Sequence, residues 1–361
     1  MPSLLASSFL VLLAVVSKTA SASLVAESFK IDVHSHVVPD FYRDALIEAG
    51  YPVKLLDGQE TLFTDGFPVS EWNLTAHIAA MDTMGVNYST LSVSAPGVNF
   101  LAGQDGGLAA AALATKLNLA MYNYTQAYPT RLGAMCILPL PDINATLAEI
   151  TFCLDVLNFD GVGMYTNANG TYLGDGALDR VFALLNARSA AVFVHPAAPS
   201  CAGAAIGYPD PMTEYPFESV RAMENMLLTG QRANYSQISM IFPHGGGAMP
   251  YLATRIAGLA SLGFLGGLDV TATLAQFRGY LFDTASATTV VQLLAMKEFF
   301  GGTGNIVTGT DYPYVPLAQG KPGLAAIQAN GNFSSSEMAQ INNQNALRIF
   351  PGVAKKLGFA I

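Results

Sequence analysis

The stretch Ile306-Val307-Thr308-Gly309-Thr310-Asp311-Tyr312-Pro313-Tyr314 places one carboxylate directly after an apolar, β-branched run. Charged residues make up only 12% of the 361-residue chain, so an acid at the end of a buried strand is unusual. A buried carboxylate is costly unless it meets a cation or hydrogen-bond donors. Asp311 therefore needs partners, and histidines are the natural ones.

Four of the five histidines close apolar, strand-like runs in the same way. The fifth, His77, lies in a helical pattern over residues 75–84, and we expect it to be structural or solvated. The other four are His34 and His36 after residues 29–33, His195 after residues 191–194, and His244 after residues 240–243.

Short apolar runs alternate with helical patterns along the whole chain. Such alternation predicts parallel βαβ units, and eight of them predict an α/β fold, a closed (β/α)8 barrel. An open, doubly wound sheet is the alternative. We expect one barrel domain over residues 24–361. The predicted strands cover residues 29–33, 88–93, 132–138, 161–165, 191–195, 238–242, 280–283 and 306–309.

Two connections are longer than ordinary loops. Residues 37–75 contain several Pro and Gly residues, and loops of that length are often functional. Residues 197–216 are rich in Pro, Gly and Ala and predict a surface excursion, with the next helix beginning at Pro216.

The beginning of the chain predicts a secreted product. Residues 1–23 read as a signal peptide, because the apolar stretch 9–16 is too short to span a bilayer and residues 20–23 are small. We expect delivery to the extracellular space or an endomembrane lumen, with no membrane insertion after removal of the leader. Glycosylation is predicted at seven Asn-X-Ser/Thr sites: Asn73, Asn87, Asn123, Asn144, Asn169, Asn234 and Asn332.

Charge and cysteine content narrow the class further. The formal net charge is −9 with no basic run, which argues against nucleic acid or an anionic membrane as partner. Cys136, Cys153 and Cys201 show no zinc or redox spacing. We expect Cys136 and Cys153 to be core thiols, with one disulfide left open.

In a barrel, the carboxyl ends of the strands face one mouth, where these histidines and Asp311 would meet. His34 and His36 are two residues apart in a strand, so both side chains point to the same side. With His195 and Asp311 they predict a shell of three histidines and one carboxylate around one divalent metal. Imidazole and carboxylate suit zinc, with manganese or iron as alternatives.

These motifs together resemble the amidohydrolase superfamily, in particular the branch typified by aminocarboxymuconate-semialdehyde decarboxylase, which includes decarboxylases of salicylate-type acids. The resemblance implies metal ligation by His34, His36, His195 and Asp311. It also implies that His244 handles a proton beside the metal. The motifs are residues 31–36, 194–196, 243–247 and 309–314.

The resemblance further concerns Arg255, eleven residues after His244. In the family, an arginine at this place reaches into the substrate site of the neighbouring subunit, which implies a homodimer. The predicted fourth strand ends Gly163-Met164-Tyr165, without the lysine that would bridge two metals, so we expect one metal. The first long loop offers only Arg43 and Lys54 as cations, which favours a monocarboxylate substrate.

We therefore predict a metal-dependent, non-oxidative decarboxylase of an ortho-hydroxybenzoate such as 6-methylsalicylate or orsellinate, in secondary metabolism. Asp311 or His244 would deliver the proton to the ring. One alternative is a mononuclear hydrolase of an amide, ester or lactone, with His244 as base. Another is a secreted, non-enzymatic glycoprotein that uses the barrel as a binding scaffold.

Overall fold

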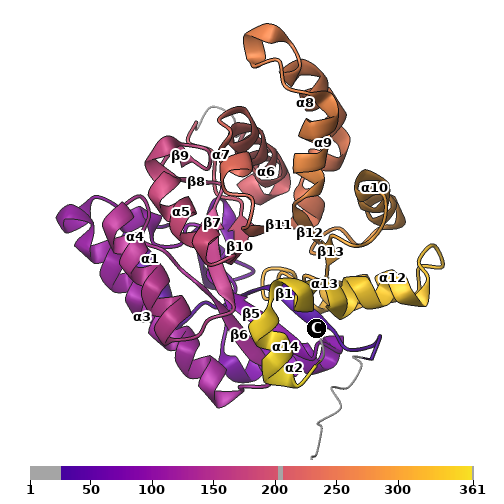
Figure 1. The fold of residues 1–361 in the computed structure, drawn as a ribbon. Helices are drawn as coiled ribbons and strands as arrows, with labels where there is room; N and C mark the ends of the chain where they lie inside the picture. The colour runs from indigo at the N-terminus through magenta and orange to yellow at the C-terminus, as the bar shows by residue number, and fades with distance from the viewer. Residues whose placement is uncertain (1–25, 202–205, 360–361) are drawn as a thin grey trace, which may run out of the picture.

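The computed structural model describes residues 26–201 and 206–359, and the predicted signal peptide lies outside them. Eight parallel strands form one sheet in sequence order, with helices packed around it (Figure 1). Asp311 N donates to His34 O at 2.8 Å and His36 N to Tyr312 O at 2.7 Å, so the last strand segment meets the first. The prediction of a (β/α)8 barrel is confirmed. The strands are β1 Ile31–His36, β5 Tyr88–Ser92, β6 Leu132–Cys136, β7 Gly161–Tyr165, β10 Ala191–His195, β11 Ser239–Phe242, β12 Leu281–Asp283 and β13 Ile306–Val307.

Period-2 apolar patterning gives the barrel an inner and an outer apolar layer. Alternate strand residues point inward, and the two C-terminal helices close the end of the barrel opposite the metal-site motifs. The outer layer packs on helices α2 Leu74–Met84, α3 Leu108–Ala127, α4 Ile143–Thr151, α5 Asp179–Ala187, α6 Asp210–Leu228, α8 Met249–Ala260, α10 Val290–Phe300 and α11 Leu317–Gln328. The inner layer comprises Ile31, Val33, Met135, Phe193, Ile241, Leu281 and Val307, with Phe350 between α13 Asn345–Ile349 and α14 Pro351–Leu357 and Val353 of α14.

The long connection after β1 has secondary structure of its own, contrary to the expectation of a loop over residues 37–75. Helix α1 Asp40–Glu48 is followed by a three-stranded antiparallel sheet, β2 Val53–Leu56, β3 Gln59–Thr64 and β4 Phe67–Pro68. We call residues 53–68 the flap. The tight turns at Asp57-Gly58 and Asp65-Gly66 have positive φ, which Asp and Gly tolerate, and they connect the three antiparallel strands.

The helix after β10 begins earlier than predicted. α6 starts at Asp210, and Pro216 lies inside it rather than at its start. Pro211 sits in the first turn, where a missing backbone N–H breaks no helical hydrogen bond, so it is this proline that marks the beginning.

Helix α8 and helix α9 Val270–Arg278 extend away from the barrel as a helical pair (Figure 1). The pair exposes large apolar side chains, with Tyr251 of α8 87% exposed and Phe264, in the connection between the two helices, 82% exposed. Among the described residues, no single helix has the length and apolar character to cross a bilayer. The segments Met249–Ala260 and Gly263–Arg278 have that length and apolar character only when taken together, and the chain bends by 110° between them.

Cys136 and Cys153 are fully buried, but they are paired as a disulfide rather than free thiols. The packing of α4 and the short π-helix Phe152–Val156 against β6 brings their Cα atoms to 5.9 Å, which is within disulfide reach. The prediction of two core thiols is corrected in this respect. Cys201 is exposed and free.

Candidate metal centre

The five residues selected from the sequence meet at the carboxyl ends of the barrel strands. Ligand atoms of His34, His195, His244 and Asp311 all lie within 4.8 Å of one another. His36 Nε2 is 3.0 Å from His34 Nε2 and 3.2 Å from Asp311 Oδ1. A β-bulge between Asp32 and Ser35 in β1 turns the His34 side chain toward this centre.

Three of the imidazoles are oriented by a hydrogen bond on their outer nitrogen. His34 Nδ1 lies 2.8 Å from a carboxylate oxygen of Asp283, and His195 Nδ1 lies 2.7 Å from Pro196 O. These acceptors can only receive a proton, so each Nδ1 carries one. His36 Nδ1 lies 3.0 Å from Ser92 Oγ, whose own proton goes to Ser35 O.

Each of these three rings therefore presents a bare Nε2 to the centre. Imidazoles that bind metals are generally fixed in this way by a second hydrogen bond on the outer nitrogen. Three such lone pairs, together with the Asp311 carboxylate, form a donor set that suits a divalent cation.

His244 is held differently. Its backbone lies at φ 57°, and its N–H donates to Asp283 Oδ1 at 3.0 Å. Its Nε2 is 3.4 Å from Asp311 Oδ2, while within the described chain no hydrogen bond engages its Nδ1. The side chain is 16% exposed, whereas those of His34 and His36 are fully buried. His244 is thus the histidine that faces the open side of the site.

The electrostatics of the cluster favour one positive charge at its centre. Burial opposes protonation of His34, yet the carboxylates of Asp283 and Asp311 together raise the pKa of its imidazole to about 10. Burial opposes ionisation of Asp311, but His34, His244 and His36 hold the pKa of that carboxyl well below its usual range. Burial lowers the pKa of His36 to about 4. The proton that this raised pKa favours on His34 supplies a positive charge between the two carboxylates, and a bound cation would supply that charge in its place.

Two carboxylates that sequence reasoning did not select support the centre. Asp283 ends β12 and accepts hydrogen bonds from His34, His244 and Ala285. It follows the apolar Leu281-Phe282, so the signal that selected Asp311, an acid ending an apolar strand, could have found it too.

Asp32 is the second of these carboxylates. It lies in β1 and accepts hydrogen bonds from the backbone of His34 and Thr310 at 3.0 Å and from the hydroxyls of Ser89 and Thr310. Because Ser89 belongs to β5 and Thr310 follows β13, Asp32 joins the three neighbouring strands beneath the metal site.

Aromatic rings surround the cluster. Phe193 lies 4.8 Å from the His34 ring, Tyr314 lies 5.4 Å from the His36 ring, and Tyr215 lies 5.7 Å from the His195 ring. Such walls exclude water and suit a flat, apolar substrate.

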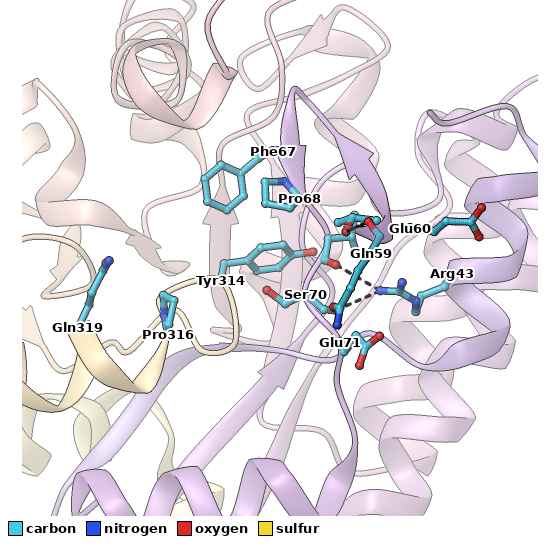
Figure 2. A pocket seen from close by; sticks show the side chains of 12 residues that line it. Arg43, Gln59, Glu60, Phe67, Pro68, Ser70, Glu71, Tyr314, Pro316 and Gln319 are labelled. Atoms are coloured by element: carbon cyan, nitrogen blue, oxygen red, sulfur yellow. Dashed lines mark hydrogen bonds between the residues drawn. The ribbon is translucent and has the colours of Figure 1, made fainter. Parts of the chain in front are cut away.

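The flap and the segment after β13 enclose a cavity of about 370 Å³ (Figure 2). Phe67 and Pro68 line one side of it and Tyr314 the other. The Arg43 guanidinium also lines this cavity, where it donates to the carbonyls of Val69 and Ser70.

Two predicted cations lie outside the cluster. Arg255 is on the exposed face of α8 and takes part in none of the salt bridges of the described chain. Lys54 is exposed on β2, with its ammonium 5.5 Å from the centre of the Phe63 ring. His77 is buried, as expected for a structural residue, and its Nδ1 accepts from Trp72 Nε1 at 2.9 Å.

Residues 31–352 match the amidohydrolase family. The 6-methylsalicylic acid decarboxylase of Penicillium expansum is 33% identical over 292 residues, which cover 80% of this chain and 86% of that protein. Decarboxylase yanB of Aspergillus niger is 30% identical over 334 residues, covering 89% and 87%. A crystal structure of 5-carboxyvanillate decarboxylase from Novosphingobium aromaticivorans, complexed with manganese and a nitrobenzoic acid, superimposes with a TM-score of 0.76 at 20% identity, covering 93% of this chain and 100% of that one.

Proposed function

Because this chain belongs to the amidohydrolase family, we propose that it is a carboxy-lyase that removes carbon dioxide from an ortho-hydroxybenzoate of the 6-methylsalicylate type. The observation that carries the proposal is the set of three Nδ1-anchored imidazoles and one carboxylate, with His244 beside them. The family and this donor set indicate one divalent metal. The named activities of the fungal relatives support the substrate class.

The donor set favours zinc, with manganese as the alternative, held by His34, His36, His195 and Asp311. When bound, the metal supplies a positive charge that orients the carboxylate and ortho-hydroxyl of the acid and stabilises the developing phenolate. The aromatic walls hold the ring flat and keep water out.

The protein's own task is to deliver one proton. The bond between the ring carbon and the carboxylate breaks, its electron pair stays on the ring, and carbon dioxide leaves. The ring carbon then takes a proton, which His244 or Asp311 holds at the open side of the site. His244 fits this role because no hydrogen bond within the described chain engages its Nδ1. Its side chain is also partly exposed, whereas those of His34 and His36 are fully buried.

The test is metal content together with carbon dioxide release from a panel of salicylate-type acids. We expect about one metal per chain and gas release that a chelator abolishes. His34→Ala should lose both metal and turnover while the barrel stays folded. Full turnover without bound metal would contradict the proposal, and uptake of water by an amide, ester or lactone without gas release would favour the hydrolase.

We further propose that the enzyme works as a homodimer in which Arg255 serves the partner's substrate site. Arg255 points outward from α8, and the α8–α9 pair carries exposed Tyr251 and Phe264. Arg255→Ala and His34→Ala should each be inactive alone. Co-expressed, they should recover about a quarter of the activity, since random pairing makes half of the dimers mixed, each with one intact site. No recovery in isolated mixed dimers would exclude this arrangement.

We also propose that the chain enters the secretory pathway and carries N-linked glycans. The apolar leader supports this, and six of the seven predicted acceptor asparagines are exposed; Asn87, whose Oδ1 accepts from Lys30 N, is half-buried. Endoglycosidase treatment of the secreted protein should increase its electrophoretic mobility, and N-terminal sequencing should begin near residue 24. An unprocessed N-terminus with no mobility shift would contradict the proposal.

A further inference from the structure

The flap reaches across the barrel mouth and is attached on both sides of the metal centre. On one side, its Asp65 turn contacts α6. On the other, Phe67 and Pro68 of β4 face Tyr314 across the cavity of Figure 2, and Ser70 Oγ, two residues after the flap, donates to Pro313 O at 3.2 Å. Each attachment lies next to a ring that contacts a proposed metal ligand.

The attachment at α6 is made by a few specific contacts. Tyr215 Oη donates to Asp65 Oδ2 at 2.6 Å, and Asp210 N donates to Asp65 O at 3.0 Å. Gly66, at φ +75°, lies so close to α6 that a Cβ would come to 3.0 Å from Pro209 Cα. Only a glycine allows this approach without displacement of the turn.

Tyr215 also contacts the metal centre. Its ring meets that of His195 edge to face, with centroids 5.7 Å apart and an interplanar angle of 85°. Only 7% of the residue is exposed, so the hydroxyl and the ring are both held in place. The other side of the His195 ring is fixed by the bond from Nδ1 to Pro196 O. One side chain thus touches the flap with its hydroxyl and a metal ligand with its ring.

Elsewhere in the flap, Leu62 and Thr64 of β3 are buried, but β2 has little packing to hold it down. All four residues of β2 are exposed, and Leu55 is 75% exposed. Because only these two flap side chains are buried, the hydrogen bond to the Asp65 carboxylate adds a substantial share of the free energy that keeps the flap closed.

We propose that Tyr215 is a positioning residue that couples closure of the flap to the metal centre, with its hydroxyl holding the Asp65 turn over the mouth and its ring holding the imidazole of His195. The flap thereby forms a wall of the substrate site that closes only when the His195 ring is in place. The inference rests on the proposed metal centre for its zinc-binding readout and on the proposed activity for its kinetic readout, whereas the proteolysis readout depends on neither.

Trypsin measures opening of the flap directly. Lys54, on exposed β2, is the only lysine or arginine between Arg43 and Lys116, so cleavage there reports on this segment. Tyr215→Phe keeps the ring and removes the hydroxyl. Cleavage after Lys54 should become about tenfold faster or more, because proteolysis follows the population of the open form and a hydrogen bond to a charged group is lost.

Tyr88→Phe is the matched control. Tyr88 Oη donates to Asp160 Oδ2 at 2.7 Å, near the amino ends of the strands and away from the flap. Its loss should leave the rate of cleavage after Lys54 unchanged. Cleavage of Tyr215→Phe at the wild-type rate would overturn the proposal. Equal acceleration of cleavage in Tyr88→Phe would also overturn it, because it would indicate global destabilisation.

A second pair of variants tests the link through Asp65. Asp65→Asn keeps the shape and tolerates the positive φ, but it removes the charge that strengthens the bond. This variant should accelerate cleavage in the wild-type background and have no further effect when combined with Tyr215→Phe. Additive effects of the two substitutions would show that they act independently, against the proposal.

Zinc binding separates the two functions of the side chain. In a competition titration of metal-free protein with Zn²⁺ and a chromophoric chelator, Tyr215→Phe should bind as the wild type does. Tyr215→Leu, which removes the ring from His195, should bind about tenfold to a hundredfold more weakly. Unchanged zinc affinity in Tyr215→Leu would overturn the role of the ring.

With an active substrate, Tyr215→Phe should raise KM about tenfold and leave kcat within about threefold, since the wall moves while the metal stays. A fall in kcat at unchanged KM would contradict the flap's role. If no acid of the panel is decarboxylated, the proposed function fails, whereas proteolysis and zinc binding still decide the role of Tyr215.

Discussion

Replacing Asp283 by Asn should weaken metal binding although Asp283 is not one of the proposed metal ligands. The side chain is fully buried and accepts three hydrogen bonds: Oδ2 from His34 Nδ1 at 2.8 Å, and Oδ1 from the backbone of His244 at 3.0 Å and of Ala285 at 2.9 Å. An amide of the same shape has one acceptor and one donor, so it cannot satisfy both sides.

Each orientation of the amide leaves a conflict. With its oxygen toward the backbone, the NH₂ group faces His34 Nδ1, which must then accept, and the imidazole proton moves to Nε2, the atom that should face the metal. With the oxygen toward His34, the NH₂ group faces two backbone N–H groups, and an unpaired buried donor costs about 1–3 kcal/mol. Zinc affinity should therefore fall about tenfold to a hundredfold, or about 1.4–2.7 kcal/mol.

The assay is competition between the metal-free protein and a chromophoric chelator for Zn²⁺ at neutral pH. Asp160→Asn is the control, because Asp160 is also buried and accepts from Tyr88 Oη, but near the amino ends of the strands. It should lose stability and keep zinc affinity. Wild-type affinity in Asp283→Asn, or an equal loss in Asp160→Asn, would refute the tautomer argument.

His244→Gln should keep zinc affinity and release carbon dioxide about 10²–10⁴-fold more slowly, since it removes the proton donor; loss of the metal would instead make His244 a ligand. Burial lowers the pKa of His77 from 6.5 to about 4, so the folded state excludes the proton. The free energy of unfolding should therefore decrease as the pH falls from 6.5 to about 4. Urea titrations should show a decrease about 3 kcal/mol larger in the wild type than in His77→Gln. Reduction of the Cys136–Cys153 disulfide should cost about 2–4 kcal/mol by thermal unfolding; Cys201→Ser should behave as the wild type.

Barrel and metal-site residues were predictable because their signals are local. Apolar runs of strand length alternate with helical patterns, and this periodicity specifies parallel units whichever residues they contact. His34, His36, His195, His244 and Asp311 each follow such a run, and the barrel brings all strand ends to one mouth. The same signal is weaker at Asp283, because β12 contributes only three residues.

The flap shows where local signals mislead. Pro and Gly in residues 37–75 predicted a loop, but they form the tight turns of a small antiparallel sheet whose position is set by contacts with α6 and Tyr314. Pro216 likewise predicted a helix start and lies inside α6. The position of the flap thus depends on tertiary contacts, which sequence spacing does not encode, whereas the start of α6 follows from the local signal of Pro211.

The sequence by itself determined the strand count, the α/β alternation and the residues that could bind a metal, because periodicity and residue type depend only on neighbours along the chain. Only the tertiary structure decided the tautomers of His34 and His36, the pairing of Cys136 with Cys153 and the contact between Asp65 and Tyr215. These features join residues from 17 to 249 positions apart. Such contacts exist only once the barrel has closed and brought the strand ends together.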